Sequence, residues 1–200
     1  MISGSVIHGL NILVVMISYP IYIKYLGFEL FSVWSLLSVV VSFAMMGNLG
    51  IGRAVVTFVA NAKSEKNYLE VNRIYHAAFV ITLIPSILIA IIIWIFSPQI
   101  VKLLEVPIQH YSVSVIVVKF IGIAIGTYLF HDMMIGVITG LGRLDISNLI
   151  LLLLNIFKVI NTVLFLMVGL SLKGLIYGTL TANLVFIGIT FLLLVKKFLN

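Results

Sequence analysis

The chain contains no cysteine and few charged residues. Only 9% of its 200 residues are Asp, Glu, Lys or Arg, whereas a water-soluble domain ordinarily carries about a quarter. The absence of cysteine excludes disulfides, thiolate metal sites and a cysteine nucleophile. Because 62% of the residues are hydrophobic, the composition is that of a membrane protein and not of a soluble domain.

Charge is missing altogether from four long stretches, which are residues 1–23, 30–52, 74–101 and 174–195. A hydrocarbon core about 30 Å thick needs roughly 20 apolar residues of α-helix, so each stretch can cross a bilayer. Tyr111–Leu141 and Ile146–Gly169 are also long enough, but they contain Lys119, Asp132 and Lys158. The chain is therefore predicted to be an all-α, polytopic membrane protein.

Six transmembrane helices account for residues 1–200, without a linker or a soluble domain. We place them at about residues 2–22, 31–50, 74–96, 112–139, 146–169 and 174–195. An even number of spans puts both termini on one side of the membrane. On that side lie Arg53, Lys63, Lys66, Arg73, Arg143, Lys196 and Lys197, and on the other Lys24, Lys102 and Lys173. Because basic residues near span ends resist translocation, both termini are predicted to be cytoplasmic.

Motifs of enzymes and of nucleic-acid binding are missing. The net charge of +6 comes from Lys and Arg dispersed between apolar runs, not gathered on a basic face. The chain has no His-x-x-x-His pair, no nucleophile elbow and no acidic cluster suited to a metal. We therefore expect no enzymatic activity, no nucleic-acid partner, no metal and no cofactor.

The deepest charge in the predicted spans belongs to Lys158. It lies about a dozen residues from either end of its span, roughly 17 Å from each surface, so its side chain cannot easily reach the headgroups. Asn148, Asn155 and Thr162 share its face of the helix, at about 100° per residue. Charges at such depth usually mark a substrate or ion path. This polar stripe is therefore predicted to line a cavity, with a structural ion pair as the alternative.

The first span carries a second polar line, formed by Gly4, His8, Asn11 and Ser18. Two such stripes can line one cavity between their helices. Alternatively, His8 and Asn11 only form hydrogen bonds with neighbouring helices.

Two further charges lie in the fourth span. Lys119 is about 10 Å from the outer end, so its side chain either reaches the headgroups or joins the path. Asp132 lies about 10 Å to the cytoplasmic side of the centre, where it can meet Lys158 on the antiparallel fifth helix. Such a pair lowers the cost of burying both charges without any role in transport. The adjacent His131 is either a satisfied polar residue or a proton carrier.

Backbone features predict how the helices bend and pack. Pro85, in the middle of the third span, removes a helical hydrogen bond and predicts a kink, which is either a static bend or a hinge. Gly122 and Gly126, then Gly136 and Gly140, predict close approach of neighbouring helices to the fourth span. The short connections after this span predict that spans four to six are antiparallel neighbours. Residues 51–68 begin with an apolar run, which predicts that the second helix continues along or beyond the interface.

Several short motifs follow one another in a definite order. They are Pro20, Tyr25-Leu26-Gly27, Phe31-Ser32-Val33-Trp34, Asn48-Leu49-Gly50-Ile51-Gly52-Arg53, Gly140-Leu141-Gly142-Arg143 with Asn148, and Gly169 followed by Gly174-Leu175-Ile176-Tyr177-Gly178. In order and spacing, they resemble the polysaccharide flippases of the multidrug, oligosaccharidyl-lipid and polysaccharide exporter superfamily. The resemblance covers nearly the whole chain and implies the amino-terminal half of a protein with two six-helix lobes.

The resemblance also implies a function in a prokaryotic plasma membrane. A flippase of this kind moves lipid-linked oligosaccharide, such as an O-antigen precursor, to the outer leaflet by alternating access. Its partners are then the lipid-linked oligosaccharide, the membrane lipids and a second six-helix lobe, in cis or in trans.

The candidate path residues have separate roles in this interpretation. Lys158, with Lys119 and Arg53, attracts the diphosphate. Asn155, Asn148 and Asn11 offer hydrogen bonds to sugar hydroxyls, and Asp132 or His131 takes part in counter-ion coupling. Two alternatives stay open: a multidrug or small-molecule exporter of the same superfamily, whose cavity should favour acidic residues if its cargo is cationic, and a non-transporting six-span membrane subunit.

Overall fold

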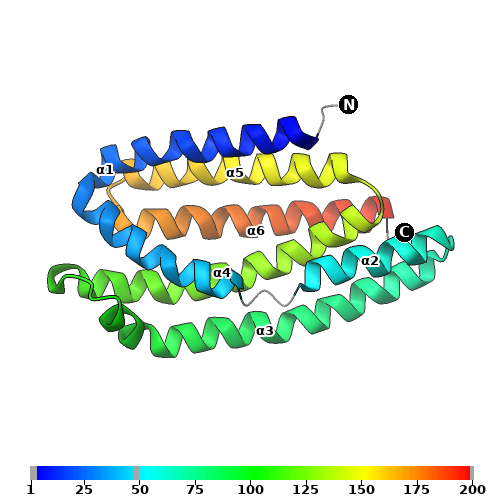
Figure 1. Ribbon diagram of the computed structural model, residues 1–200, viewed down its shortest axis with the longest axis horizontal. Helices are drawn as coiled ribbons and strands as arrows, with labels where there is room; N and C mark the ends of the chain where they lie inside the picture. The colour runs from blue at the N-terminus through cyan, green and yellow to red at the C-terminus, as the bar shows by residue number, and fades with distance from the viewer. Residues whose placement is uncertain (1–3, 47–49, 199–200) are drawn as a thin grey trace.

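The structure is a computed structural model that describes residues 4–46 and 50–198, apart from the side chains of residues 4, 5, 8, 44–46, 197 and 198. Every regular element in these residues is helical. Inside a bilayer no water satisfies the backbone N–H and C=O groups, so even a chain rich in Ile and Val folds into helices, whose hydrogen bonds are internal. The helices run roughly along the long axis of the molecule (Figure 1). The predicted all-α fold is confirmed.

The described chain forms six α-helices and one short 3-10 turn. Their bounds are α1 Gly4–Met46, α2 Ile51–Ser64, α3 Tyr68–Leu103, η1 Ile108–His110, α4 Tyr111–Gly140, α5 Leu144–Met167 and α6 Ser171–Phe198. Five described segments are long and apolar enough to cross a membrane. The first of these segments, Gly9–Phe43, contains most of the first two predicted spans.

α1 reverses its direction at Gly27. The φ of 74° and ψ of 167° at this residue are not helical, and this backbone conformation is nearly confined to glycine. The residues before and after Gly27 form two arms of α1 that run in opposite directions (Figure 1). The first two predicted spans are therefore joined by a single non-helical residue and not by a loop.

α2 begins after Gly50, which has a φ of 67° and caps the helix without a side-chain hydrogen bond. The helix runs towards the same end of the molecule as the second arm of α1, at an angle to that arm (Figure 1). It packs against α3 and α4. The predicted continuation of the second helix thus exists as a separate helix that lies against protein.

Both ends of the described chain lie at the end of the molecule that also holds the α2–α3 and α4–α5 turns (Figure 1). Lys63 of α2 donates a hydrogen bond of 2.6 Å to the carbonyl of Leu141, just after α4, and so joins these two turns. Gly142 and Gly169 have φ values of 72° and 86°, as is usual for a glycine that follows the end of a helix. The opposite end holds the bend of α1, η1 and the α5–α6 turn.

Glycines on α4 set its distance from the neighbouring helices. A Cβ atom added to Gly126 would lie 2.8 Å from the carbonyl oxygen of Ser86 in α3, and one added to Gly136 would lie 2.7 Å from that of Gly52 in α2. Gly122 and Gly140 are equally close to α3 and α2. Residues without a Cβ permit such approaches between helices, so the predicted packing role of the four glycines is confirmed.

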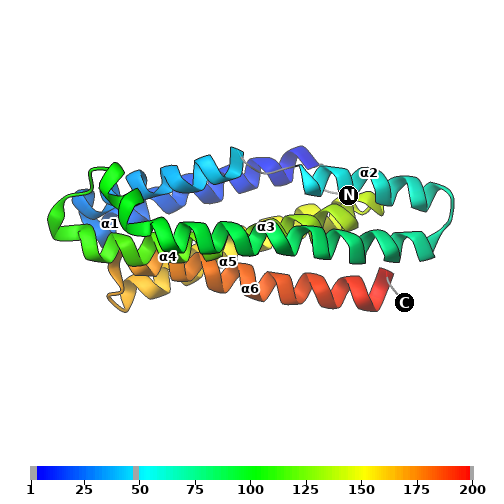
Figure 2. The same ribbon diagram turned by 90° about the horizontal axis from the view of Figure 1, so that it is seen from below.

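α6 packs against both α4 and α5, and α5 packs in turn against α1. In the view turned by 90°, α1 and α2 lie along one side of the lobe and α6 along the other, with α3 and α4 between them (Figure 2). Asn183 of α6 donates to the carbonyl of Ala124 in α4 at 3.2 Å. Contacts between α4 and α5 are few, although their short connection predicted closer neighbours.

We expect Gly126→Ala to destabilise the lobe by about 1–3 kcal/mol, because its new methyl group would push α4 away from the Ser86 carbonyl. Gly188→Ala on α6 is the matched control, since a Cβ atom there meets nothing within 4 Å. Thermal unfolding of the purified protein in detergent compares the two variants. Equal unfolding midpoints would contradict the packing role of Gly126.

Gly27→Ala should destabilise the reversal of α1 by about 1–3 kcal/mol through backbone strain alone, because there is open space around the added methyl group. Gly9→Ala lies in the same helix, is equally unobstructed and should be neutral or slightly stabilising. The free energy of unfolding, measured by titration with a denaturing detergent, distinguishes them. A Gly27→Ala variant as stable as Gly9→Ala would argue against strain at the bend.

Candidate functional site

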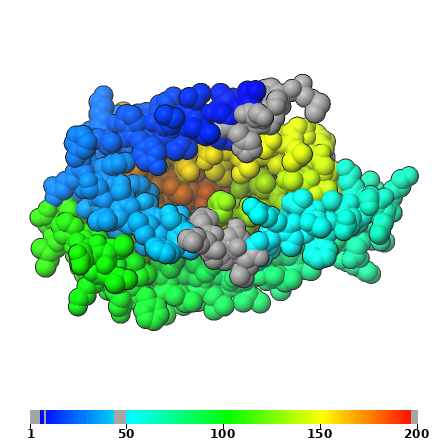
Figure 3. Space-filling model, viewed as in Figure 1, coloured from blue at the N-terminus to red at the C-terminus, as the bar shows by residue number. Residues whose placement is uncertain are grey.

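One face of the lobe is hollowed between the two arms of α1 and α2, and parts of α4, α5 and α6 are visible inside the hollow (Figure 3). Two polar cavities are formed by these helices. We name them the α1–α5 cavity and the α2–α4 cavity, after the helices that supply most of each lining.

The α1–α5 cavity has a volume of about 160 Å³. Its lining consists of Val14, Val15, Ser18, Tyr19, Tyr22, Trp34, Asn155, Lys158, Val159, Thr162, Leu175 and Thr179. α5 supplies Asn155, Lys158 and Thr162 from successive turns of one face, as the 3.6-residue helical period requires. The structure therefore brings three members of the predicted α5 stripe to one cavity wall.

The first arm of α1 forms the facing wall. Ser18 from the second predicted stripe lies there. Asn11, from the same stripe, accepts a hydrogen bond of 2.9 Å from the side-chain amide of Asn155. The polar lines of the first and fifth predicted spans thus face each other. Asn11 does not line the cavity itself, and its contact with Asn155 is the hydrogen bond between helices that the alternative interpretation expected.

Lys158 supplies the charge of the α1–α5 cavity. Its side chain is half-buried, and the described lining residues include no Asp or Glu. Hydroxyl and amide groups from Ser18, Thr162 and Asn155 line the same cavity, together with aromatic rings. An ammonium group beside neutral donors and acceptors can bind a small anion in a place where hydrocarbon would otherwise exclude it.

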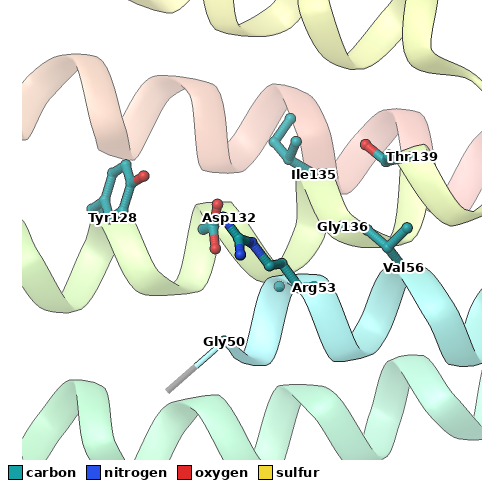
Figure 4. A pocket seen from close by; sticks show the side chains of 9 residues that line it. Gly50, Arg53, Val56, Tyr128, Asp132, Ile135, Gly136 and Thr139 are labelled. Atoms are coloured by element: carbon teal, nitrogen blue, oxygen red, sulfur yellow. The ribbon is translucent and has the colours of Figure 1, made fainter. Parts of the chain in front are cut away.

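The α2–α4 cavity is larger, with a volume of about 520 Å³. Its lining consists of Gly50, Gly52, Arg53, Val56, Tyr128, Asp132, Ile135, Gly136 and Thr139. Figure 4 shows the side chain of Arg53 directed from α2 towards Asp132 on α4. The Asp132 carboxylate lies so close to Gly52 that a Cβ atom at that glycine would collide with it. This cavity therefore contains one charge of each sign.

The remaining predicted site residues are not brought together. Lys158 and Asp132 line different cavities. The ammonium of Lys119 lies 5.2 Å from the centroid of the Trp94 ring, a cation–π distance, and Lys119 lines neither cavity. Asn148 is half-buried near the start of α5, also away from both linings. The side chain of His8 lies outside the described residues.

Two further candidates, His131 and Pro85, line neither cavity. His131 is buried, and its Nε2 lies 3.1 Å from the hydroxyl oxygen of Thr190 in α6. It therefore has a polar partner. α3 continues as one helix through Pro85, and the hinge role of this residue stays a prediction.

Sequence reasoning did not identify several lining residues. Tyr128 and Thr139 precede and follow Asp132 by four and seven residues, so the helical period places them on its face of α4. That signal was present in the sequence. Tyr19, Tyr22 and Trp34 reach the α1–α5 cavity from the two arms of α1, and their meeting depends on the reversal at Gly27.

Comparisons with known proteins agree with this architecture. A family model described as MatE matches residues 7–164. No curated protein matches the chain in sequence. One similar solved structure is described as the inward-facing conformation of a multidrug resistance MATE family transporter of the MOP superfamily. It shares 19% identity and has a TM-score of 0.80 over 94% of this chain and 45% of that chain.

A second similar structure is described as a MOP superfamily transporter from Pyrococcus furiosus Vc1 (DSM3638), for which reverse polarity of the binding pocket suggests a different function. It shares 13% identity, with a TM-score of 0.79 over 96% of this chain and 44% of that chain. The predicted exporter-type fold is confirmed, and the chain spans less than half the length of both structures. Because the matched family model extends over most of the sequence, the chain belongs to the MatE family.

Proposed function

We propose that this chain forms one lobe of a transporter that moves lipid-linked oligosaccharide from the cytoplasmic to the outer leaflet of a prokaryotic plasma membrane. Its MatE family membership and its likeness to about 45% of a larger MATE family transporter support a lobe that works with a second one. Rocking of two such lobes gives alternating access to a site between them. Both termini then face the cytoplasm, as the distribution of basic residues predicts.

The observation that carries this proposal is the position of Lys158 in the α1–α5 cavity. A phosphate-bearing headgroup needs cationic and hydrogen-bonding groups along its way past the hydrocarbon. Lys158 supplies the positive charge, and Asn155 and Thr162 supply neutral polar groups one turn before and after it. Because the described lining contributes no carboxylate, its electrostatic potential favours an anion over a cation.

An exporter of cationic drugs is the second candidate. The solved relative described as a multidrug resistance transporter has the same fold, and Asp132 supplies an acidic group in the α2–α4 cavity. In this alternative, Asp132 and not Lys158 meets the cargo, and replacing Lys158 leaves transport intact.

We expect Lys158→Ala to lower the rate of lipid-linked oligosaccharide flipping about tenfold or more, because one charge-assisted hydrogen bond contributes about 1.5–3 kcal/mol. The measurement uses the complete protein in proteoliposomes that contain labelled lipid-linked oligosaccharide. Lys158→Arg, which keeps the charge, should retain more of the rate than Lys158→Ala.

Lys119→Ala is the matched control, because it removes another lysine from a membrane span but one that contacts Trp94 and not the cavity. Its flipping rate should stay near that of the wild type. A wild-type rate in Lys158→Ala, or an equal loss in Lys119→Ala, would refute the role assigned to Lys158. Export of cationic dyes by the same proteoliposomes would then favour the drug exporter.

A transporter should admit water to the α1–α5 cavity, whereas a non-transporting subunit should exclude water from it. Only an ionised thiolate reacts with a water-soluble maleimide, so Asn155→Cys should be labelled at least about tenfold faster than Leu153→Cys if water enters. Leu153 lies on the same helix, is 46% exposed and does not line the cavity, so it faces lipid. Equally slow labelling of both variants would indicate a dry, structural interface.

A further inference from the structure

The α2–α4 cavity differs in chemistry from the cavity that contains Lys158. It combines a guanidinium, a carboxylate, a phenol and a hydroxyl, from Arg53, Asp132, Tyr128 and Thr139. At about 520 Å³, it falls within the roughly 300–1,000 Å³ that is usual for small-molecule sites. Asp132 lies inside the fourth predicted span, and an ionisable group at such depth is costly and is usually retained for a function.

The cavity results from the close approach of two helices. A Cβ atom added to Gly136 of α4 would lie 2.7 Å from the carbonyl oxygen of Gly52, in the first turn of α2. Tyr128, Asp132 and Thr139 follow one another along α4 and line one cavity with Arg53 and Val56 of α2 (Figure 4). Side chains of both helices therefore point into one shared space.

The opposite charges of Arg53 and Asp132 limit the kinds of ligand that the α2–α4 cavity can bind. A cation that approaches Asp132 meets the positive charge of Arg53, and an anion that approaches Arg53 meets the negative charge of Asp132. A neutral ligand avoids both repulsions and can still hydrogen-bond to each group. Arg53 offers five N–H donors, and the carboxylate of Asp132 offers about four lone-pair positions, so it can accept hydroxyl protons while keeping its contacts within the fold.

The neutral lining groups favour a ligand rich in hydroxyl groups. The hydroxyl of Thr139 donates to Ser147 at 3.0 Å, which leaves its oxygen able to accept from a ligand. Tyr128 is 37% exposed, and its ring offers an apolar surface to the C–H face of a sugar ring. Alternating hydroxyl and C–H groups are characteristic of carbohydrates among neutral ligands.

We propose that the α2–α4 cavity binds a sugar unit of the oligosaccharide headgroup, while the diphosphate occupies the α1–α5 cavity. This rests on the proposed function and assigns Arg53 to the sugar instead of the diphosphate. Asp132 accepts hydroxyl protons, Arg53 donates to hydroxyl or ring oxygens, and the Tyr128 ring packs against the sugar. The lobe then distinguishes a glycosylated carrier from a bare one.

The test measures occupancy of each cavity separately in the complete protein, on a cysteine-free background. Val56→Cys places a thiol in the α2–α4 cavity and Val159→Cys places one in the α1–α5 cavity, and neither change removes a proposed ligand contact. A water-soluble maleimide labels each variant with or without a probe. The probes are phosphate-free oligosaccharide released by acid from the source organism's lipid carrier, pyrophosphate, and tetramethylammonium.

We expect the oligosaccharide, and neither ion, to slow the labelling of Val56→Cys. Adding Asp132→Asn should raise the concentration for half-protection about tenfold, the equivalent of one hydrogen bond to a charged group. Tyr128→Leu is a second variant, needed because Asp132 also packs against Gly52, and it should weaken protection in the same direction. Asp145→Asn removes an exposed acid that pairs with Arg143 at 3.1 Å outside the cavity and should change nothing.

Protection of Val56→Cys by pyrophosphate or tetramethylammonium, or no protection by the oligosaccharide, would overturn the sugar site. Protection that survives both Asp132→Asn and Tyr128→Leu would overturn it as well. The proposed function is judged independently, by whether pyrophosphate protects Val159→Cys. Pyrophosphate protection at Val159→Cys without sugar protection at Val56→Cys would therefore reject only the further inference.

Discussion

Close approach of α4 to α2 and α3 is the constraint on which the lobe depends. Lipid tails are as apolar as Leu or Ile, so helices gain little by hiding such side chains from them, and packing must come from short-range contacts. Gly126 and Gly136 remove the Cβ atoms that would hold the helices apart. Dispersion contacts and interhelical hydrogen bonds, such as that from Asn183 to the Ala124 carbonyl, then form. The same approach at Gly136 brings Arg53 and Asp132 to one cavity.

The two cavities of the lobe differ in the charged groups that line them. Lys158 stands among neutral groups in the smaller cavity, whereas Arg53 and Asp132 bring opposite charges to the larger one. A phosphate-bearing glycolipid has the matching division, with charge at the phosphate and neutral hydroxyl groups on the sugars. In the proposed function, this difference in potential between the cavities, and not either residue alone, favours a phosphate-bearing glycolipid over a simple cation.

Helical periodicity placed three of the four residues of the predicted α5 stripe on the wall of the α1–α5 cavity, whereas Asn148 lies outside its lining. Asn155, Lys158 and Thr162 share one face of α5 in any helix, because their spacing follows the 3.6-residue turn. Periodicity did not predict which residues would lie next to the charged side chains of Lys119 and Asp132. Lys119 contacts the Trp94 ring, and Asp132 lies beside α2, although its depth in the membrane allowed a pairing with Lys158. Depth is a one-dimensional quantity, and it leaves the rotation of each helix about its axis undetermined.

The sequence by itself determined the membrane class, the helical fold and the polar faces, because hydrocarbon thickness and the helical period act along the chain without reference to distant residues. Tertiary structure decided how those faces meet. The reversal at Gly27, the contact of Asn11 with Asn155 and the approach of Gly52 to Gly136 join segments whose packing no local pattern specifies. Which charges share a cavity depends on these contacts, since a hydrogen bond forms only at about 3 Å and the Coulomb energy of two charges falls as their distance grows.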